Sequence, residues 1–279
     1  MDLLPVEFIE EVLYINPFRK VATFKELSGF YGLSAAQLEE NHSCKTLYIY
    51  NGQFEGTVIR NCAGSASQSR GKYRPWKHVS YETSDKETVP EIDPNLSTAL
   101  EKYFNEPGVL CLDLHSCSLN EKWVQLFSSW KSLNSVLVCD GYGEHVLQLL
   151  RNLLQEQQLL SLRLNSTEYG TQEIELFFKF LEQKQFVVLW VMTPETRVKD
   201  QILAEQDVKR FAGSSVAWNY RIELYDESFE ALDRVQLTKR KFRKGNFLVL
   251  YSNNEADETM TEKEFMDGVD LTELQFLDG

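Results

Sequence analysis

Histidine, cysteine and long apolar runs are all scarce in this sequence. Its 279 residues include 4 histidines and 5 cysteines, and no two of the histidines have the spacing of a zinc site. An odd number of cysteines argues against a disulfide framework. No stretch approaches the roughly 18 apolar residues that a membrane-spanning helix needs. We therefore expect no bound metal, no cofactor, no structural disulfides and no membrane span.

Positive charge is also in short supply. The 29 Lys and Arg residues against 42 Asp and Glu give a net charge of −13, which argues against a nucleic-acid partner because phosphate backbones require a basic surface. The acidic start, Met-Asp-Leu-Leu-Pro, lacks the layout of a signal peptide. We expect a cytoplasmic or nuclear protein.

One basic run interrupts this acidic chain, at residues 239–244. It is interpreted as a solvated hairpin turn, because Gly245-Asn246 and an apolar stretch follow it. The alternative is a nuclear-localisation signal or a patch for an acidic partner.

What the chain does contain is a recurring pattern of the form apolar-x-x-apolar-x-apolar. Within residues 109–192 it occurs four times, and its middle positions, Leu112, Val136, Leu162 and Leu189, lie 24, 26 and 27 residues apart. Each occurrence predicts a short strand. Between them the apolar residues follow helical spacing, which predicts three amphipathic helices. The helical sets are Trp123, Leu126, Phe127 and Trp130; Val146, Leu149, Leu150, Leu153 and Leu154; and Ile174, Phe177, Phe178 and Leu181.

A strand-helix unit at this period resembles the leucine-rich repeat, in which stacked neighbours share one core. Looser units centred on Leu47 and Val79 precede the regular four. The expected fold class is therefore α/β, a solenoid of this kind with a mostly parallel sheet and helices on its outer face. An ordinary doubly wound sheet is the alternative. The expected division is a helical segment at 1–43, a repeat domain at 44–251 with its regular core at 109–192, and an acidic helix or tail at 252–279.

The first residues carry a second resemblance. Leu4-Pro5 followed by apolar residues at helical spacing, ahead of degenerate repeats and a Glu-Phe-Met-Asp-Gly-Val-type tail, resembles nematode F-box and F-box-associated proteins. The resemblance implies that Leu4, Pro5, Phe8 and Ile9 contact a Skp-type adaptor of a cullin ubiquitin ligase, while the repeats choose the substrate. The alternative is an N-terminal cap for the repeats.

Catalysis is not expected. The segment Cys139 to His145 contains Gly141-x-Gly143 between a strand and a helix, where a phosphate-bearing cofactor could lie. However, its third glycine is replaced by Val146. The pairs Cys139 with His145 and His115 with Cys117 are too close in sequence to define a dyad, and acidic neighbours do not favour a reactive thiol.

Binding is expected on the strand face that points away from the apolar core, because side chains alternate across a strand. The partner-binding residues predicted there are Asp113, His115, Arg163, Asn165, Trp190 and Met192, with Leu137 and Cys139 between them. Aromatic and arginine side chains dominate protein-binding surfaces. The sequence thus predicts a non-enzymatic protein-recognition module, the substrate arm of a ubiquitin ligase or an adaptor-free repeat scaffold. The alternative function is a cofactor-binding transferase that uses the Gly141–Gly143 turn.

Overall fold

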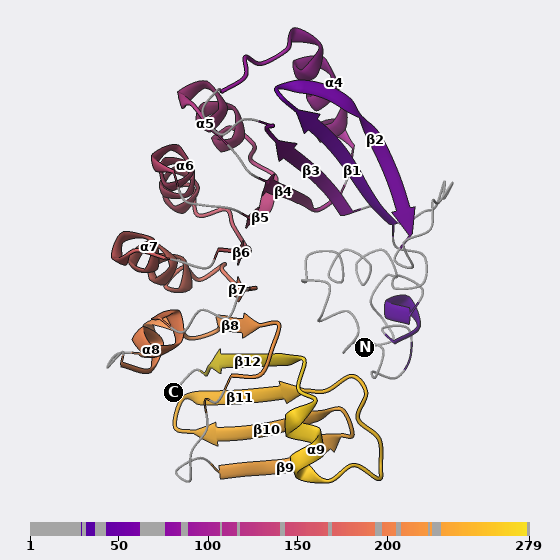
Figure 1. Cartoon of the computed structure of the whole chain (residues 1–279), viewed down its shortest axis with the longest axis vertical. Helices are drawn as coiled ribbons and strands as arrows, with labels where there is room; N and C mark the ends of the chain where they lie inside the picture. Colours follow the sequence, from indigo (N-terminus) through magenta and orange to yellow (C-terminus); the bar gives the residue numbers. More distant parts are fainter. Residues whose placement is uncertain are drawn as a thin grey trace. The chain divides into compact units, whose positions relative to one another are not determined.

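The computed structural model describes most of the chain in two compact units. The first contains the described residues up to Ser118 together with Trp130–Asn134, and the second contains Leu119–Ser129 and the described residues from Ser135 onward. Strands and helices alternate in both units, so the predicted α/β class is confirmed (Figure 1). The described residues are 29, 32–36, 43–61, 76–84, 89–106, 108–115, 118–139, 143–166, 169–192, 197–204, 208–222, 224 and 230–277.

The first unit is a four-stranded arrangement in the order β2-β1-β3-β4. Strands β1 and β2 form an antiparallel hairpin, whereas β1, β3 and β4 are parallel. The hairpin turns at Asn51-Gly52, where φ is 48° and 77°, as an Asn-Gly pair predicts. Its elements are β1 (Ser43–Tyr50), β2 (Gln53–Asn61), β3 (Trp76–Glu82), α4 (Pro94–Asn105) and β4 (Leu110–His115).

The second unit begins with strand-helix units whose strands lie side by side in chain order. Strands β5, β6, β7 and β8 are all parallel, and the connecting helices lie along one face of them (Figure 1). The elements are α5 (Glu121–Ser128), β5 (Leu133–Val138), α6 (Glu144–Gln155), β6 (Ser161–Leu164), α7 (Thr171–Leu181), β7 (Val188–Val191), α8 (Arg197–Ala204), the 3-10 turn η1 (Val208–Phe211) and β8 (Ser215–Trp218).

The centres of the predicted repeats are direct neighbours in the strand register. Leu47 pairs with Val79, and Val79 pairs with Leu112, in the first unit. In the second unit, Val136 pairs with Leu162 and Leu162 with Leu189. All six side chains are buried. Each apolar pattern therefore supplies one position of a shared core, which confirms the predicted strands and their common register.

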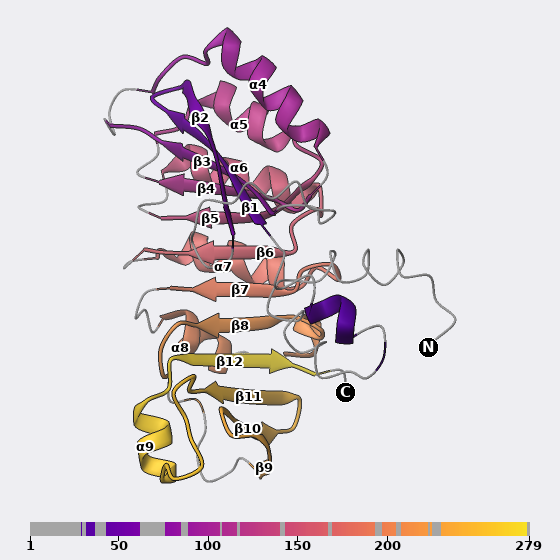
Figure 2. The same cartoon turned by 90° about the vertical axis from the view of Figure 1, so that its right-hand side faces the viewer.

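The end of the second unit is antiparallel. The sequence predicts a hairpin there, but not a strand after residue 270. Strand β12 (Leu271–Phe276) lies between β8 and β11 (Phe247–Ser252), and β10 (Lys239–Lys244) and β9 (Glu230–Gln236) complete the order (Figure 2). The segment 252–279, expected to be a helix or tail, thus contributes a central strand as well as helix α9 (Glu262–Asp267). The alternating burial of β12 explains its place, because every second side chain from Thr272 to Phe276 is buried.

The basic run is a strand rather than a turn. Residues 239–244 form β10, and the hairpin turn lies after it at Gly245-Asn246. Arg240 is buried, with its guanidinium 3.9 Å from the ring centre of Phe265 and its Nε 3.1 Å from Glu262. One cation of the run therefore holds α9 on the sheet, a use of arginine that charge spacing does not reveal.

Candidate functional site

Three side chains form a row across the parallel strands of the second unit, on the face opposite the repeat centres. Leu137 pairs with Arg163, and Arg163 with Trp190. All three are half-buried, while their neighbours along each strand point into the core. We call Leu137, Arg163 and Trp190 the strand-face row. The predicted residues Asn165 and Met192 lie two residues beyond Arg163 and Trp190, just past the ends of β6 and β7. Asn165 is half-buried and Met192 is exposed.

Arg163 has an unsatisfied donor within this row. Its Nε is buried and has no hydrogen-bond partner in the described part of the chain. A buried guanidinium N–H without an acceptor costs about 1–3 kcal/mol. A ligand that supplies the acceptor would remove this cost. A carboxylate or backbone carbonyl from a bound protein has the chemistry required.

The other two predicted face residues belong to the first unit and have a different role. Asp113 and His115 lie on β4, opposite Ser80 and Glu82 of β3. Asp113 Oδ2 is 2.9 Å from Nδ1 of His78. Asp113 is thus already engaged within its own unit, and is not a free contact for a partner.

The histidine that Asp113 orients also meets a cysteine, and the sequence analysis missed this cluster. Cys44 lies two residues before Thr46, the register partner of His78, so its thiol is on the same face as the His78 ring. Its Sγ is 3.8 Å from Thr46 Oγ1. Cys44 is half-buried on β1, His78 is on β3 and Asp113 is on β4. The cluster therefore places a thiol beside an imidazole that is itself bonded to a carboxylate. This is the arrangement of an activated nucleophile.

The surroundings favour a charged pair in this cluster. Burial alone lowers the pKa of His78, but its hydrogen bonds to Asp113 and Cys44 and the nearby negative charge raise it to about 11. Burial raises the pKa of Cys44, yet the hydrogen bond and charge of His78 and the hydrogen bond of Thr46 bring the net pKa below its ordinary 9.0. Both shifts favour the charged forms of the pair, a thiolate and an imidazolium.

The pairing of Cys44 with His78 is expected to make the free energy of unfolding fall at alkaline pH. Because the pKa of His78 rises from 6.5 to about 11, its contribution is complete below pH 6.5 and is lost as the pH rises through about 11. The lowered pKa of Cys44 has the opposite effect only below its ordinary 9.0, so between pH 9 and 11 Cys44 no longer offsets the loss from His78. Urea unfolding of the chain and of His78→Gln at both pH values measures it: the advantage of the parent chain should shrink at pH 11. An advantage that is equal at both pH values would contradict the charged pair.

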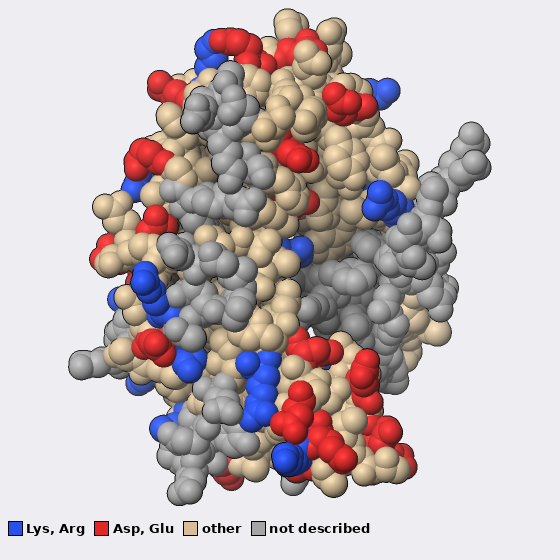
Figure 3. Space-filling model, viewed as in Figure 1, with Lys and Arg blue, Asp and Glu red and all other residues tan. Residues whose placement is uncertain are grey.

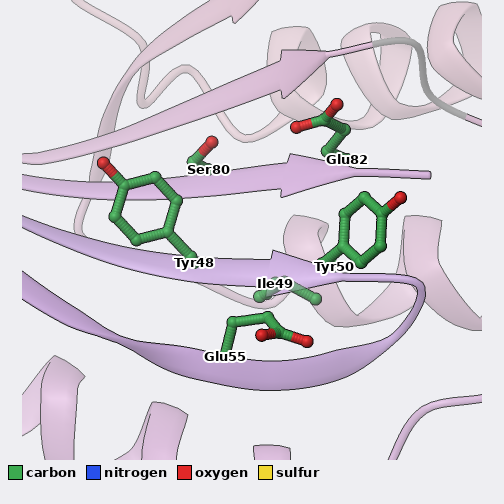
Figure 4. A pocket seen from close by; sticks show the side chains of 6 residues that line it. All are labelled: Tyr48, Ile49, Tyr50, Glu55, Ser80 and Glu82. Carbon is green, nitrogen blue, oxygen red and sulfur yellow. The ribbon is translucent and has the colours of Figure 1, made fainter. Parts of the chain in front are cut away.

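A pocket of about 230 Å³ opens on the same face of the first unit. Tyr48 and Tyr50 rise from β1 beside Ser80 and Glu82 of β3, and Glu55 approaches from β2 (Figure 4). The lining residues carry two carboxylates and two phenol rings, and none of them is basic. Such a lining attracts a cation, through both charge and the ring faces.

Acidic side chains also gather over the α9 end of the second unit (Figure 3). The carboxylates there are used locally: Glu264 forms a capping box with Thr261, and Asp257 accepts hydrogen bonds from Thr259. These bonds lower the pKa of Glu264 and of Asp257. The acidic surface therefore serves helix and turn formation. Exposed there are Glu255, Asp257, Glu258, Glu262, Glu264 and Asp267.

Two predicted sites fall wholly or partly outside the described residues. The adaptor-contacting residues Leu4, Pro5, Phe8 and Ile9 lie there, as do Gly141 and Tyr142 of the glycine turn. Of that turn the structure describes Gly143, which begins α6 without a side-chain cap. The next residue, Glu144, pairs with Arg151 at 2.8 Å and is exposed.

Within the described ranges no group of three or more His, Cys, Asp or Glu side chains is arranged to hold a metal ion. No described helix has the length and apolar character needed to cross a bilayer. Comparison of the chain with protein-family models, with curated proteins and with solved structures gave no match.

Proposed function

We propose that the chain is a protein-recognition module that binds a partner across the strand-face row, in a fold of leucine-rich-repeat-like solenoid type. The strands β5 to β8 follow chain order without reversal, and the repeat centres are register neighbours, both of which favour a stacked-repeat architecture over a doubly wound sheet. The observation that carries the proposal is the buried Nε of Arg163, which lacks an acceptor between an apolar residue and a tryptophan.

The row has the composition of an energetic centre in a protein interface. Tryptophan and arginine are among the residue types most enriched in contacts that dominate binding, and they contribute most where the complex removes them fully from water. A segment laid across the row would cover Trp190 and Leu137 and direct an acceptor at Arg163. The partner is therefore expected to present an apolar side chain next to a carboxylate or an exposed carbonyl.

We further propose that the chain acts as the substrate-binding subunit of a Skp–cullin–F-box ubiquitin ligase in the cytoplasm or nucleus. The support is the likeness of the first residues to an F-box, with Leu4, Pro5, Phe8 and Ile9 as adaptor contacts. The same protein would then hold its adaptor and its substrate through separate residues. A recognition module without an adaptor is the competing form of the proposal.

Two variants separate these functions in one capture experiment on the full chain. Phe8→Asp should abolish recovery of a Skp-type adaptor and leave the substrate bound, because the two sets of contacts are independent. Arg163→Ala with Trp190→Ala should leave the adaptor bound and weaken substrate capture at least tenfold, since hot-spot truncations cost about 2 kcal/mol or more. Quantitative mass spectrometry of the captured proteins measures both.

Arg151→Ala is the matched control for Arg163, because it removes the same side chain from helix α6 in the same unit. It should change neither partner. Recovery of a substrate without any ligase component would establish the adaptor-free form. Partners that bind the double variant as tightly as the parent chain would show that the strand-face row is not the recognition surface.

A further inference from the structure

We propose that Cys44 is a nucleophile that accepts an acyl group from an ester or thioester, with His78 as its proton partner and Asp113 as the residue that positions His78. The proposal adds a covalent activity in the first unit to the recognition surface of the second. It rests on the side-chain cluster and on the pocket beside it, and it is independent of the strand-face row.

The strand register brings the three side chains to one face. Thr46 pairs with His78, and Cys44 lies two residues before Thr46 on β1, so both point to the same side. His78 pairs with Cys111, and Asp113 lies two residues after it on β4. Neighbouring strands are about 4.8 Å apart, a spacing that lets side chains on adjacent strands touch. The thiol, the ring and the carboxylate therefore meet across three adjacent strands.

The hydrogen bonds assign a role to each member. The Asp113 carboxylate accepts from Nδ1 of His78 at 2.9 Å, which fixes the ring orientation and leaves Nε2 as the nitrogen available to Cys44. The backbone of His78 is held as well, because its carbonyl accepts a hydrogen bond from the hydroxyl of Tyr103 at 2.9 Å. The cluster thus holds a nucleophile, a proton partner and an orienting carboxylate, the three groups that thiol hydrolases use.

Three other ionisable groups lie near the Cys44 thiol, and none of them replaces His78 as its proton partner. Arg60 of β2 is the register partner of Cys44 and is exposed, and a cation on that side favours the thiolate. Cys111, on the same face of β4, is buried. Asp113, whose negative charge disfavours the thiolate, is bonded to His78. Cys44 therefore has two basic neighbours, the exposed Arg60 on β2 and the half-buried His78 on β3.

The chemical step follows from these positions. The Cys44 thiolate attacks the carbonyl carbon of the donor and forms a carbon–sulfur bond. The carbon–oxygen or carbon–sulfur bond of the donor breaks, and the departing alkoxide or thiolate takes the proton of His78. The products are an S-acyl Cys44, a neutral His78 and a free alcohol or thiol, so the step needs no oxidant or further reactant.

The neighbouring pocket indicates which donor binds best. Ser80, in the pocket wall, is two residues beyond His78, which corresponds to about 7 Å along β3. Glu55, Glu82, Tyr48 and Tyr50 line the same pocket, so a donor with a cationic group on a short chain places its charge there while its carbonyl reaches the thiol. The preferred substrate class is an ester or thioester that carries an ammonium group.

The test uses the full chain and two matched thioesters, of Nα-acetyl-lysine and of Nα-acetyl-norleucine, which differ in the terminal ammonium. Mass spectrometry of peptides should find the acyl group on Cys44, at a higher rate with the lysine probe. Substitution of both Glu55 and Glu82 by glutamine should remove that preference. Equal rates for the two probes on the parent chain would refute the cation pocket, and no acylation of Cys44 by either would refute the nucleophile.

The alkylation rate of Cys44 in the parent chain provides a second test, which does not depend on whether a variant folds. Alkylation of Cys44 by iodoacetamide at pH 6.5 should be at least tenfold faster in the native chain than in urea, because an ordinary thiol is only about 1% thiolate at that pH. His78→Gln should lose this advantage and Asp113→Asn should lose part of it, whereas Cys139→Ser, a change at another half-buried cysteine, should retain it. Equal native and unfolded rates in the parent chain would overturn the proposal.

Discussion

Replacement of Trp218 by alanine is expected to lower the free energy of unfolding by about 3–5 kcal/mol. Trp218 is fully buried. It pairs with Val191 of β7 on one side and with Thr272 of β12 on the other, where the parallel strands meet the antiparallel ones. Truncation leaves a large cavity at that junction, which the strands cannot close because both neighbours are hydrogen-bonded to β8. Urea unfolding followed by circular dichroism measures the loss.

Trp218→Phe separates packing from polarity at the same position. The indole Nε1 is buried without a hydrogen-bond partner in the described structure, and such a group costs about 1–3 kcal/mol. Phenylalanine removes that unsatisfied donor while it retains most of the ring volume, so its loss should be well under half that of alanine. Trp190→Ala, at a half-buried tryptophan of the strand-face row, should cost less than Trp218→Ala. A phenylalanine variant as unstable as the alanine variant would mean that the indole N–H contributes to stability.

The repeated apolar pattern predicted the parallel strands because the shared core determines both which residues are buried and how neighbouring strands align. A strand that contributes its central residue to a shared core must align that residue with its neighbours. Leu47, Val79 and Leu112 therefore became register partners in the first unit. The strand β12 escaped prediction because it shares no common period with the other strands. It joins β8 from more than 50 residues away in sequence, with Thr272 opposite Trp218.

The Cys44 cluster was missed for a related reason. Searching for pairs at short spacing cannot find His78 and Asp113, which are 35 residues apart. The repeat centres contain the missing information: His78 precedes the centre Val79 by one residue, and Asp113 follows the centre Leu112 by one. Aligning the centres would have placed both on the face away from the core. The donor left unsatisfied on Arg163 has no such signal, because it depends on the packing of side chains around the guanidinium.

Lys77, in contrast to Arg163, is a buried cation whose ammonium group is hydrogen-bonded. It occupies the core face of β3 between Lys45 and Leu110 in the register, and it is 1% exposed. Its Nζ donates to the carbonyls of Tyr103 at 3.2 Å and of Glu106 at 2.6 Å, at the C-terminal end of α4. The Tyr103 carbonyl also accepts the backbone N–H of Glu106 at 3.3 Å. Carbonyls at this end of α4 carry the negative end of the helix dipole. A cation at that point both caps the helix and fastens it to the sheet.

Replacement of Lys77 by methionine is therefore expected to destabilise the chain by about 2–3 kcal/mol, because it removes the charged donor that bonds the carbonyls of Tyr103 and Glu106. Methionine preserves the length of the apolar stem, so the loss reports the ammonium and not a cavity. Lys102→Met removes the same charge from an exposed position in the last turn of α4 and should change stability by less than about 0.5 kcal/mol. Burial lowers the pKa of Lys77, while the Glu106 carboxylate acts against that shift. An unfolding free energy that rises in Lys77→Met would mean that desolvation of the ammonium outweighs its three carbonyl contacts, as happens for some buried ion pairs.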